Sequence, residues 1–379
     1  MSKWITAAAF AQRELAKPIS PNVSKCTVKA SFATELSGSA FRLVFAEDYG
    51  KKRAEYISAV VEVEDEKIQL TVNGKKDFVV EAGKEVRSDK VELPLKAGQE
   101  ITLLLAMGKK RSLSETTLAQ SHSAKGDYTM EGYEALPYKS PLPDMPFSER
   151  LCGLKALEVE MEENVPSASV AVIGDSITEM GFWIAPLRQA VREQQPELAV
   201  LNLGVGGNRL LRDTKAPIMR GANAFGKAAL KRLDWDVLAL SGVKAVIVAL
   251  GINDIAQPGG HPMFSPPKSE TVDAEELKAG FRELIERCHA KGLKVIGATI
   301  TPFGGFPTYN ENTAKVRNEI NEWIRSSGEF DMLADLAAAF EGEALPEKMH
   351  VGDHLHLNPG GGQLAARQID VSKILNLIQ

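Results

Sequence analysis

The pattern of apolar and polar positions changes near residue 150. Before that point, short segments alternate apolar with polar residues, which is the pattern of half-buried β-strands. These segments lie at 26–32, 39–45, 57–63, 68–72, 78–80, 90–95 and 100–105. Asn73-Gly74 follows the fourth segment, and this dipeptide favours a tight hairpin turn. Closely spaced short strands of this kind predict a β-sandwich or jelly-roll-like domain.

Beyond residue 150, longer and continuously apolar segments alternate with segments of helical period. Strands are predicted at 169–173, 198–203, 244–250, 293–300 and 331–336. Helices are predicted at 183–195, 273–291, 311–326 and 359–378. Continuously apolar strands are buried on both faces, and their alternation with helices indicates a parallel sheet with right-handed crossovers. The second half is therefore predicted to be an α/β domain.

Residues 108–150 are polar and contain four prolines, which predicts an extended connection. We therefore expect an N-terminal β-domain with its linker at 1–150 and an α/β domain at 151–379. The length of the chain agrees with this division, because 379 residues are many for one hydrophobic core.

The composition excludes several classes of protein. Hydrophobic residues make up 44% and charged residues 25%, as in an ordinary globular protein, and the net charge of −5 gives no basic surface for nucleic acid or an anionic membrane. The three cysteines lack Cys-x-x-Cys spacing, which indicates reduced thiols. The first residues carry one positive charge and only a short apolar patch, unlike a secretory signal, so we expect a cytoplasmic location.

A Gly-Asp-Ser turn follows the strand predicted at 169–173. In open parallel sheets ligands bind beyond the carboxyl ends of the strands, so Ser176 is placed where a hydroxyl can act as a nucleophile. An ordinary strand-exit turn explains the same residues, because Asp175 or Ser176 can cap the next helix.

Three other segments bring glycine or polar residues to the same edge. Residues 204–208 contain three glycines, which let backbone N–H groups approach a ligand, and Asn253 follows the next strand. Asp353 precedes His354 and His356 ahead of the last predicted helix, where a carboxylate can orient an imidazole.

Each of these segments also has an ordinary explanation. The glycine loop lacks the Gly-x-Gly-x-x-Gly spacing, and Asn253 suits a simple turn. His354 competes with His356 as a base, and both could join Asp353 as metal ligands, although no second cluster of zinc spacing occurs. Together, however, the segments contain the nucleophile, the oriented base and the oxyanion donors that acyl transfer requires.

In this order the four segments resemble the sequence blocks of the GDSL or SGNH family of esterases and lipases. The resemblance covers about residues 168–378 and implies a flavodoxin-like, three-layer α/β/α fold with about five parallel strands. It implies no cofactor and no metal. The residues that it assigns are Ser176 as nucleophile, His356 as base with Asp353, and the N–H groups of Ser176 and Gly207 with the Asn253 amide as oxyanion hole. The order Ser, Asp, His also occurs in α/β-hydrolases, but their Gly-x-Ser-x-Gly elbow is missing.

A narrower resemblance points to a bacterial branch of this family. Its esterases are encoded with xylan-degrading enzymes and carry an N-terminal β-domain. Segments 207–211, 232–238 and 42–50 carry the similarity, with Ala46-Glu47 where the branch has Ser-Asn. The resemblance implies hydrolysis of short acyl esters, acetyl esters on carbohydrate above all, with a small-molecule or oligosaccharide ester as substrate. Loops 256–272 and 302–310 are expected to wall the pocket.

Two alternatives remain open from the sequence. The same catalysis could act on lipid esters, thioesters or aryl esters, although no long amphipathic, aromatic-rich lid is found. A carbohydrate-binding protein without catalysis is the alternative from another class. We expect no membrane or nucleic-acid partner, and a homo-oligomer stays open.

Overall fold

The computed structural model describes residues 2–13, 22–23, 26–107, 111–112, 116–118, 150–215, 217 and 225–379. The chain forms two compact units, unit 1 ending at Ser167 and unit 2 beginning at Ala168. The division falls later than the expected residue 150, because the strand β13 (Leu154–Glu162) pairs with strands of unit 1. The extended connection predicted over 108–150 lies almost wholly outside the described residues. In the described part of the chain, no helix has the length and apolar composition needed to cross a bilayer.

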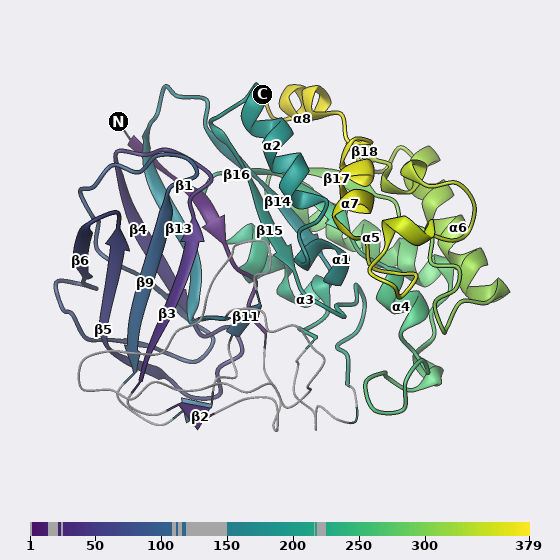
Figure 1. Cartoon of the computed structure of the whole chain (residues 1–379), viewed down its shortest axis with the longest axis horizontal. Helices are drawn as coiled ribbons and strands as arrows, with labels where there is room; N and C mark the ends of the chain where they lie inside the picture. Colours follow the sequence, from purple (N-terminus) through teal and green to yellow (C-terminus); the bar gives the residue numbers. More distant parts are fainter. Residues whose placement is uncertain are drawn as a thin grey trace. The chain divides into compact units, whose positions relative to one another are not determined.

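The described part of unit 1 contains two larger antiparallel sheets (Figure 1). One has the order β1 (Ser2–Ala9), β13, β4 (Ala40–Ala46), β8 (Glu85–Arg87). The other has the order β3 (Cys26–Ala33), β9 (Glu100–Met107), β5 (Ala54–Val63), β6 (Glu66–Leu70), and β7 (Phe78–Val80) also pairs with β5. Two short pairs are also found among the described residues: β2 (Asn22–Val23) with β10 (Arg111–Ser112), and β11 (Thr116–Leu118) with β12 (Arg150–Cys152).

Aromatic side chains join the two larger sheets of unit 1. The ring of Phe45 on β4 lies 6.2 Å from that of Tyr56 on β5 and 5.0 Å from that of Phe78 on β7, measured between centroids. All three side chains are buried, so the sheets pack face to face and the predicted β architecture is confirmed.

Local sequence signals in unit 1 predicted some of its turns and strands correctly, but not all of them. Asn73 and Gly74 both have positive φ, 52° and 77°, as the predicted tight hairpin requires. The strand predicted at 90–95 is wrong: only isolated bridges form there, and Pro94 has no N–H for a ladder. Neither β1 nor β13 was predicted.

The described part of unit 2 contains one parallel sheet of five strands. Its order is β15 (Leu198–Gly204), β14 (Ala168–Gly174), β16 (Val243–Ala249), β17 (Lys294–Ala298), β18 (Met332–Ala334). The chain runs from β14 to β15 on one side and then crosses to β16 on the other. The carboxyl end of β14 therefore lies at the topological switch point, where such sheets bind ligands.

Helices cover both faces of this sheet (Figure 1). Val170 and Val172 of β14 belong to a hydrophobic core with α2 (Ile184–Gln194), α7 (Pro359–Ala366) and α8 (Val371–Ile378). On the other face α5 (Ala274–His289) packs against β17, with α3 (Ala229–Leu233) and α6 (Glu311–Ser326) beside it. The result is the predicted three-layer α/β/α fold. The helix predicted at 359–378 is two helices, because Asp370 caps α8 by accepting the N–H of Lys373.

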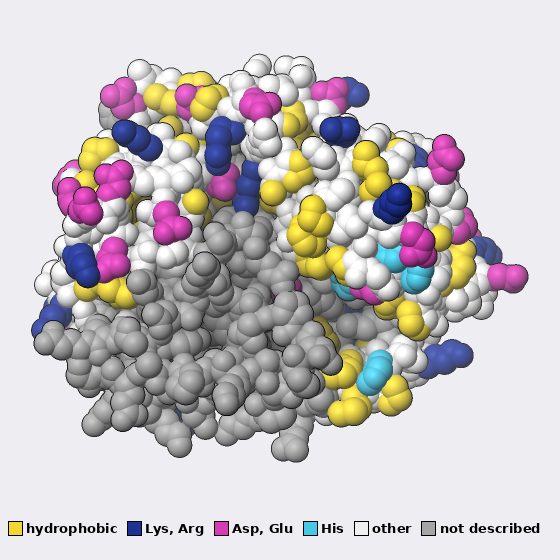
Figure 2. Space-filling model, viewed as in Figure 1, with side chains coloured by type: hydrophobic (Ala, Val, Ile, Leu, Met, Phe, Trp, Pro, Cys, Tyr) yellow, Lys and Arg dark blue, Asp and Glu magenta, His cyan; other side chains and the backbone are white. Residues whose placement is uncertain are grey.

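Charged side chains of both signs are interspersed over the described surface in Figure 2.

Three further short helices matter for the site: α1 (Ser176–Glu179), α4 (Ile252–Ala256) and the π-helix η2 (Asp234–Leu238).

Candidate active site

The register of the parallel strands brings three predicted site residues to one edge of the sheet. Gly174, the last residue of β14, pairs with Gly204 at the end of β15 and with Ala249 at the end of β16. Ser176, Gly207 and Asn253 each follow one of these strand ends within a few residues, so their loops or helices start side by side.

Asp175 and Ser176 have different roles at the end of β14. Asp175 is the N-cap of α1 and accepts the N–H of Ile177 at 2.9 Å. Its cap leaves the Ser176 hydroxyl free to bond elsewhere, and Ser176 Oγ lies 2.7 Å from Nε2 of His356. The ordinary cap explanation therefore applies to Asp175 and does not apply to Ser176.

Asp353 holds the other side of the His356 ring. Its Oδ2 lies 2.5 Å from Nδ1 of His356, and its Oδ1 accepts the N–H groups of Leu355 at 3.0 Å and His356 at 2.9 Å. Burial opposes ionisation, but the hydrogen bonds from the His356 ring and backbone outweigh it and lower the pKa of Asp353 well below its usual range. The ionised carboxylate fixes the proton on Nδ1, so Nε2 can accept the proton of Ser176.

Among the described residues, the glycine loop offers one N–H that has no acceptor. Gly206 donates its N–H to the Glu179 carboxylate at 2.6 Å. The N–H of Gly207 meets no acceptor within the described residues. Gly207 has φ 71°, and a Cβ built there would lie 2.4 Å from the Phe225 ring, so both the backbone conformation and the space require glycine.

Asn253 provides a second uncommitted donor. Its Nδ2 is buried, and among the residues that the structure describes it has no hydrogen-bond partner. Leaving a buried donor unsatisfied costs about 1–3 kcal/mol, so such a group calls for a functional explanation.

Arg232 was not assigned a role from the sequence, yet it connects these parts. Its guanidinium is fully buried and donates to the backbone oxygens of Gly174 and Leu203, both at 2.9 Å. It also donates to Asn208 Oδ1 at 2.9 Å and to Asp236 Oδ2 at 2.7 Å. One side chain therefore links the ends of β14 and β15 to the residue that follows Gly207. Apart from the family resemblance of segment 232–238, the local signal was the spacing of Arg232 and Asp236, which is common on ordinary helices.

Two buried carboxylates lie beside the site. Burial raises the pKa of Asp175 to about 7, and the charge of Asp254 adds to this, while the N–H of Ile177 opposes it. Burial also raises the pKa of Asp254 to about 6, against the hydrogen bonds from the N–H groups of Leu210 and Leu211.

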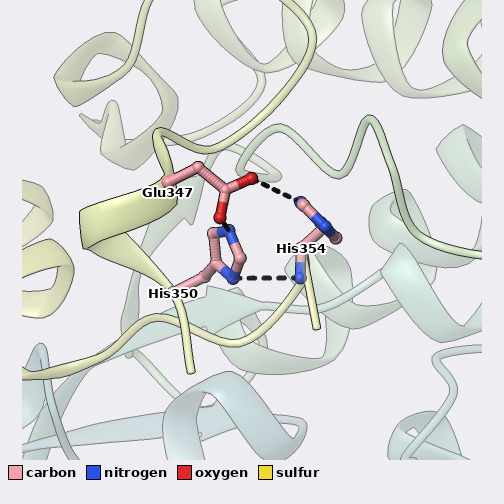
Figure 3. A group of neighbouring side chains, drawn as sticks. All are labelled: Glu347, His350 and His354. Carbon is pink, nitrogen blue, oxygen red and sulfur yellow. Dashed lines mark hydrogen bonds and ion pairs between the residues drawn. The ribbon is translucent and has the colours of Figure 1, made fainter. Parts of the chain in front are cut away.

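His354, the rival of His356, lies elsewhere. A Cβ built on Gly305 would come within 2.9 Å of His354 Cγ, so the His354 ring lies against loop 302–310. Glu347, His350 and His354 form a group whose potential metal-ligand atoms lie within 4.8 Å of one another (Figure 3). The structure thus brings His356 to Ser176 and leaves His354 in a separate cluster.

The two loops expected to wall the pocket differ in their contacts. Phe303 of loop 302–310 is fully buried and packs against Tyr309 at 5.3 Å between centroids, so its ring belongs to the protein core. Gln257 of loop 256–272 donates to the carbonyl of Gly207 at 3.4 Å. Met263 in the same loop is half exposed.

Known proteins resemble part of this chain. Residues 172–364 match the model of the GDSL-like lipase/acylhydrolase family. No curated protein matches the sequence. Among solved structures, an acetylxylan esterase from Geobacillus stearothermophilus is similar at 20% identity, over 56% of this chain and 95% of that chain, with a TM-score of 0.42. A GDSL-like lipase from Bacteroides thetaiotaomicron is similar at 18% identity, over 54% of this chain and 88% of that chain, with a TM-score of 0.39.

Proposed function

The chain belongs to the GDSL-like lipase/acylhydrolase family and is a carboxylic ester hydrolase. From this premise we propose that it releases short acyl groups, acetyl above all, from carbohydrate esters, and that the reaction passes through an acyl-enzyme on Ser176. The observation that carries the proposal is the contact of 2.7 Å between Ser176 Oγ and His356 Nε2, with Asp353 on the opposite ring nitrogen.

In the first half of the proposed reaction, Ser176 Oγ forms a bond with the ester carbonyl carbon while its proton passes to His356 Nε2. The bond to the alcohol oxygen then breaks, and His356 returns the proton to that oxygen. In the second half, a water molecule gives a proton to His356 and attacks the acyl carbon. Ser176 leaves with the proton, and the carboxylic acid is released. Asp353 stabilises the imidazolium in both halves.

The negative charge that develops on the carbonyl oxygen needs donors placed in advance. We assign this role to the N–H groups of Ser176 and Gly207 and to the side-chain amide of Asn253. The assignment is supported by the uncommitted N–H of Gly207 and the unpartnered, buried Nδ2 of Asn253 in the described part of the chain.

The preference for a short acyl group is supported by the sequence resemblance to the branch encoded with xylan-degrading enzymes. It is also supported by the sequence pattern, in which no long amphipathic, aromatic-rich lid of the kind that binds lipid is found.

We also propose that unit 1 is an accessory domain rather than the catalytic one. The support is that every residue assigned to the chemistry lies in unit 2. A fragment that begins at Ala168 is expected to hydrolyse a small aryl acetate and to lose preference for acetylated oligosaccharides. Equal preference in fragment and full chain would remove the accessory role.

The test of the proposed function uses a panel of acetylated oligosaccharides, with acetate release as the measurement. Ser176→Ala is expected to lower turnover by about 10⁴-fold or more, the scale found for removing a triad nucleophile, with little change in melting temperature. Unchanged turnover would exclude Ser176 as nucleophile. Binding of the oligosaccharides without acetate release would instead indicate a carbohydrate-binding protein.

The acyl preference needs a separate measurement on acetyl, octanoyl and palmitoyl esters of one chromophore. We expect kcat/KM to be highest for acetyl. A strong preference for palmitoyl would indicate a lipid esterase and would overturn the short-acyl proposal while leaving the serine mechanism intact.

A further inference from the structure

His350 lies at the start of the segment that carries Asp353 and His356. Its side chain is fully buried. Its Nδ1 accepts the N–H of Gly352 at 3.0 Å and the N–H of His354 at 3.2 Å. These two residues flank Asp353, so one imidazole nitrogen holds the backbone on both sides of the carboxylate that orients His356.

These hydrogen bonds determine where His350 carries its proton. A ring nitrogen that accepts N–H groups must present a lone pair, so the proton of the neutral ring is on Nε2. Nε2 is buried and, among the described residues, has no hydrogen-bond partner. Oε2 of Glu347 lies 3.7 Å from Nε2, beyond hydrogen-bond distance (Figure 3).

The same proton argues against a metal ion in the cluster of Glu347, His350 and His354. An ion bound there would need the lone pair of His350 Nε2, which would move the proton to Nδ1. A protonated Nδ1 would then face the N–H groups of Gly352 and His354, and neither hydrogen bond could form. The observed conformation of the segment therefore suits a hydrogen-bond acceptor and does not suit a metal ligand.

The remaining contacts of the segment agree with a holding role for His350. The N–H of Val351 donates to the carbonyl of His356 at 3.0 Å, and Asn358 Nδ2 donates to the carbonyl of His350 at 3.1 Å. His354 has a left-handed φ of 61°, which is unfavourable for a residue with a Cβ, and its N–H is one of the two that His350 accepts. The loop thus closes on itself around the His350 ring.

We propose that His350 is a positioning residue for the esterase reaction: it holds the Gly352–His354 backbone so that Asp353 meets His356 Nδ1. The proposal rests on the function proposed above. It assigns His350 no contact with substrate and no proton transfer.

Three substitutions separate the two ring nitrogens. In His350→Asn the amide oxygen can take the place of Nδ1, in His350→Gln the amide reaches the place of Nε2, and His350→Leu removes both. We expect His350→Asn to keep kcat within about threefold, and the Gln and Leu variants to lose about 10- to 100-fold in kcat with KM nearly unchanged, because a misplacement of about 1 Å can cost about 10²-fold. Glu347→Gln is the matched control, since Glu347 is mostly exposed, and should keep full kcat.

Melting temperatures distinguish positioning from folding. If the His350→Leu variant does not fold, kcat can still be compared between His350→Asn and His350→Gln, which carry the same amide group. Equal kcat in the Asn and Gln variants, or losses in kcat that follow the melting temperature alone, would overturn the proposal. A rise in the melting temperature of the wild type with Zn²⁺ that Glu347→Gln abolishes would overturn it too, because such binding needs the lone pair on Nε2.

One readout does not depend on turnover. The proton that His356 Nδ1 shares with Asp353 gives a low-field NMR resonance, which should persist in His350→Asn and disappear or shift in His350→Gln. Persistence of this resonance in both variants would refute the positioning role even if the natural ester is never found. Turnover retained in Ser176→Ala, in contrast, would refute the proposed function and leave the His350 result readable.

Discussion

Replacing Asn253 with alanine removes a buried donor that has no partner among the residues that the structure describes. Because an oxyanion forms only during the reaction, the amide stabilises the transition state more than the bound ester. Loss of one such donor typically costs about 2.7–4 kcal/mol, so kcat should fall by about 10²- to 10³-fold while KM changes little. Stability should barely change: removing an unsatisfied buried donor returns about 1–3 kcal/mol, which offsets the packing that the side chain provided.

Asn208→Ala is the matched control, on the neighbouring loop of the same sheet edge. Its Nδ2 donates to the carbonyls of Phe225 and Lys227, both at 2.8 Å, and its Oδ1 accepts from Arg232 at 2.9 Å. Loss of these bonds should lower the free energy of unfolding by at least about 2 kcal/mol. The assays are steady-state kinetics on an aryl acetate and calorimetric unfolding. Wild-type kcat in Asn253→Ala, or a fall in stability as large as that of Asn208→Ala, would refute the reasoning.

Three more substitutions test other parts of the site. Gly207→Ala should lower both kcat and the free energy of unfolding. The left-handed backbone alone should cost about 1–2 kcal/mol of stability, and the clash with the Phe225 ring should add to that loss. A variant with full activity and an unchanged melting temperature would contradict this expectation. Arg232→Met removes the guanidinium that forms an ion pair with the buried Asp236 carboxylate, so urea unfolding should show a loss of about 3–5 kcal/mol. The pKa of Asp175, raised from 3.8 to about 7 by burial, means that the folded state holds this proton more tightly. Its contribution to stability is therefore lost as pH rises towards about 7. Asp175→Asn removes this dependence of stability on pH. Between about pH 5 and about pH 8 the variant should therefore gain stability relative to the wild type. Parallel profiles of stability against pH in the two proteins would count against the shifted pKa.

The strands of unit 2 were predictable because burial on both faces leaves a continuous apolar pattern. The edge of the sheet after which Ser176 and Asn253 follow was also predictable, since parallel strands end together. The role of Arg232 was not, because its acceptors Asn208, Leu203 and Gly174 lie 24, 29 and 58 residues away in the sequence. No periodic pattern records contacts between such distant residues.

His350 and β13 were missed for related reasons. The importance of His350 depends on which ring nitrogen meets the backbone, a geometry that its position in the sequence does not encode. In β13, Lys155 and Glu158 are buried and charged, so the expected alternation of apolar and polar residues is interrupted. The division between the units was therefore placed too early.

The pairing of β1 with β13 has a consequence for biosynthesis. Ser2 lies opposite Glu162, so β1 has to wait for β13 to be synthesised before that edge of the sheet can close. In unit 2 the proposed nucleophile and the proposed base are separated by 180 positions. A nascent chain can therefore close the edge between β1 and β13 before it contains the residues proposed to cleave an ester.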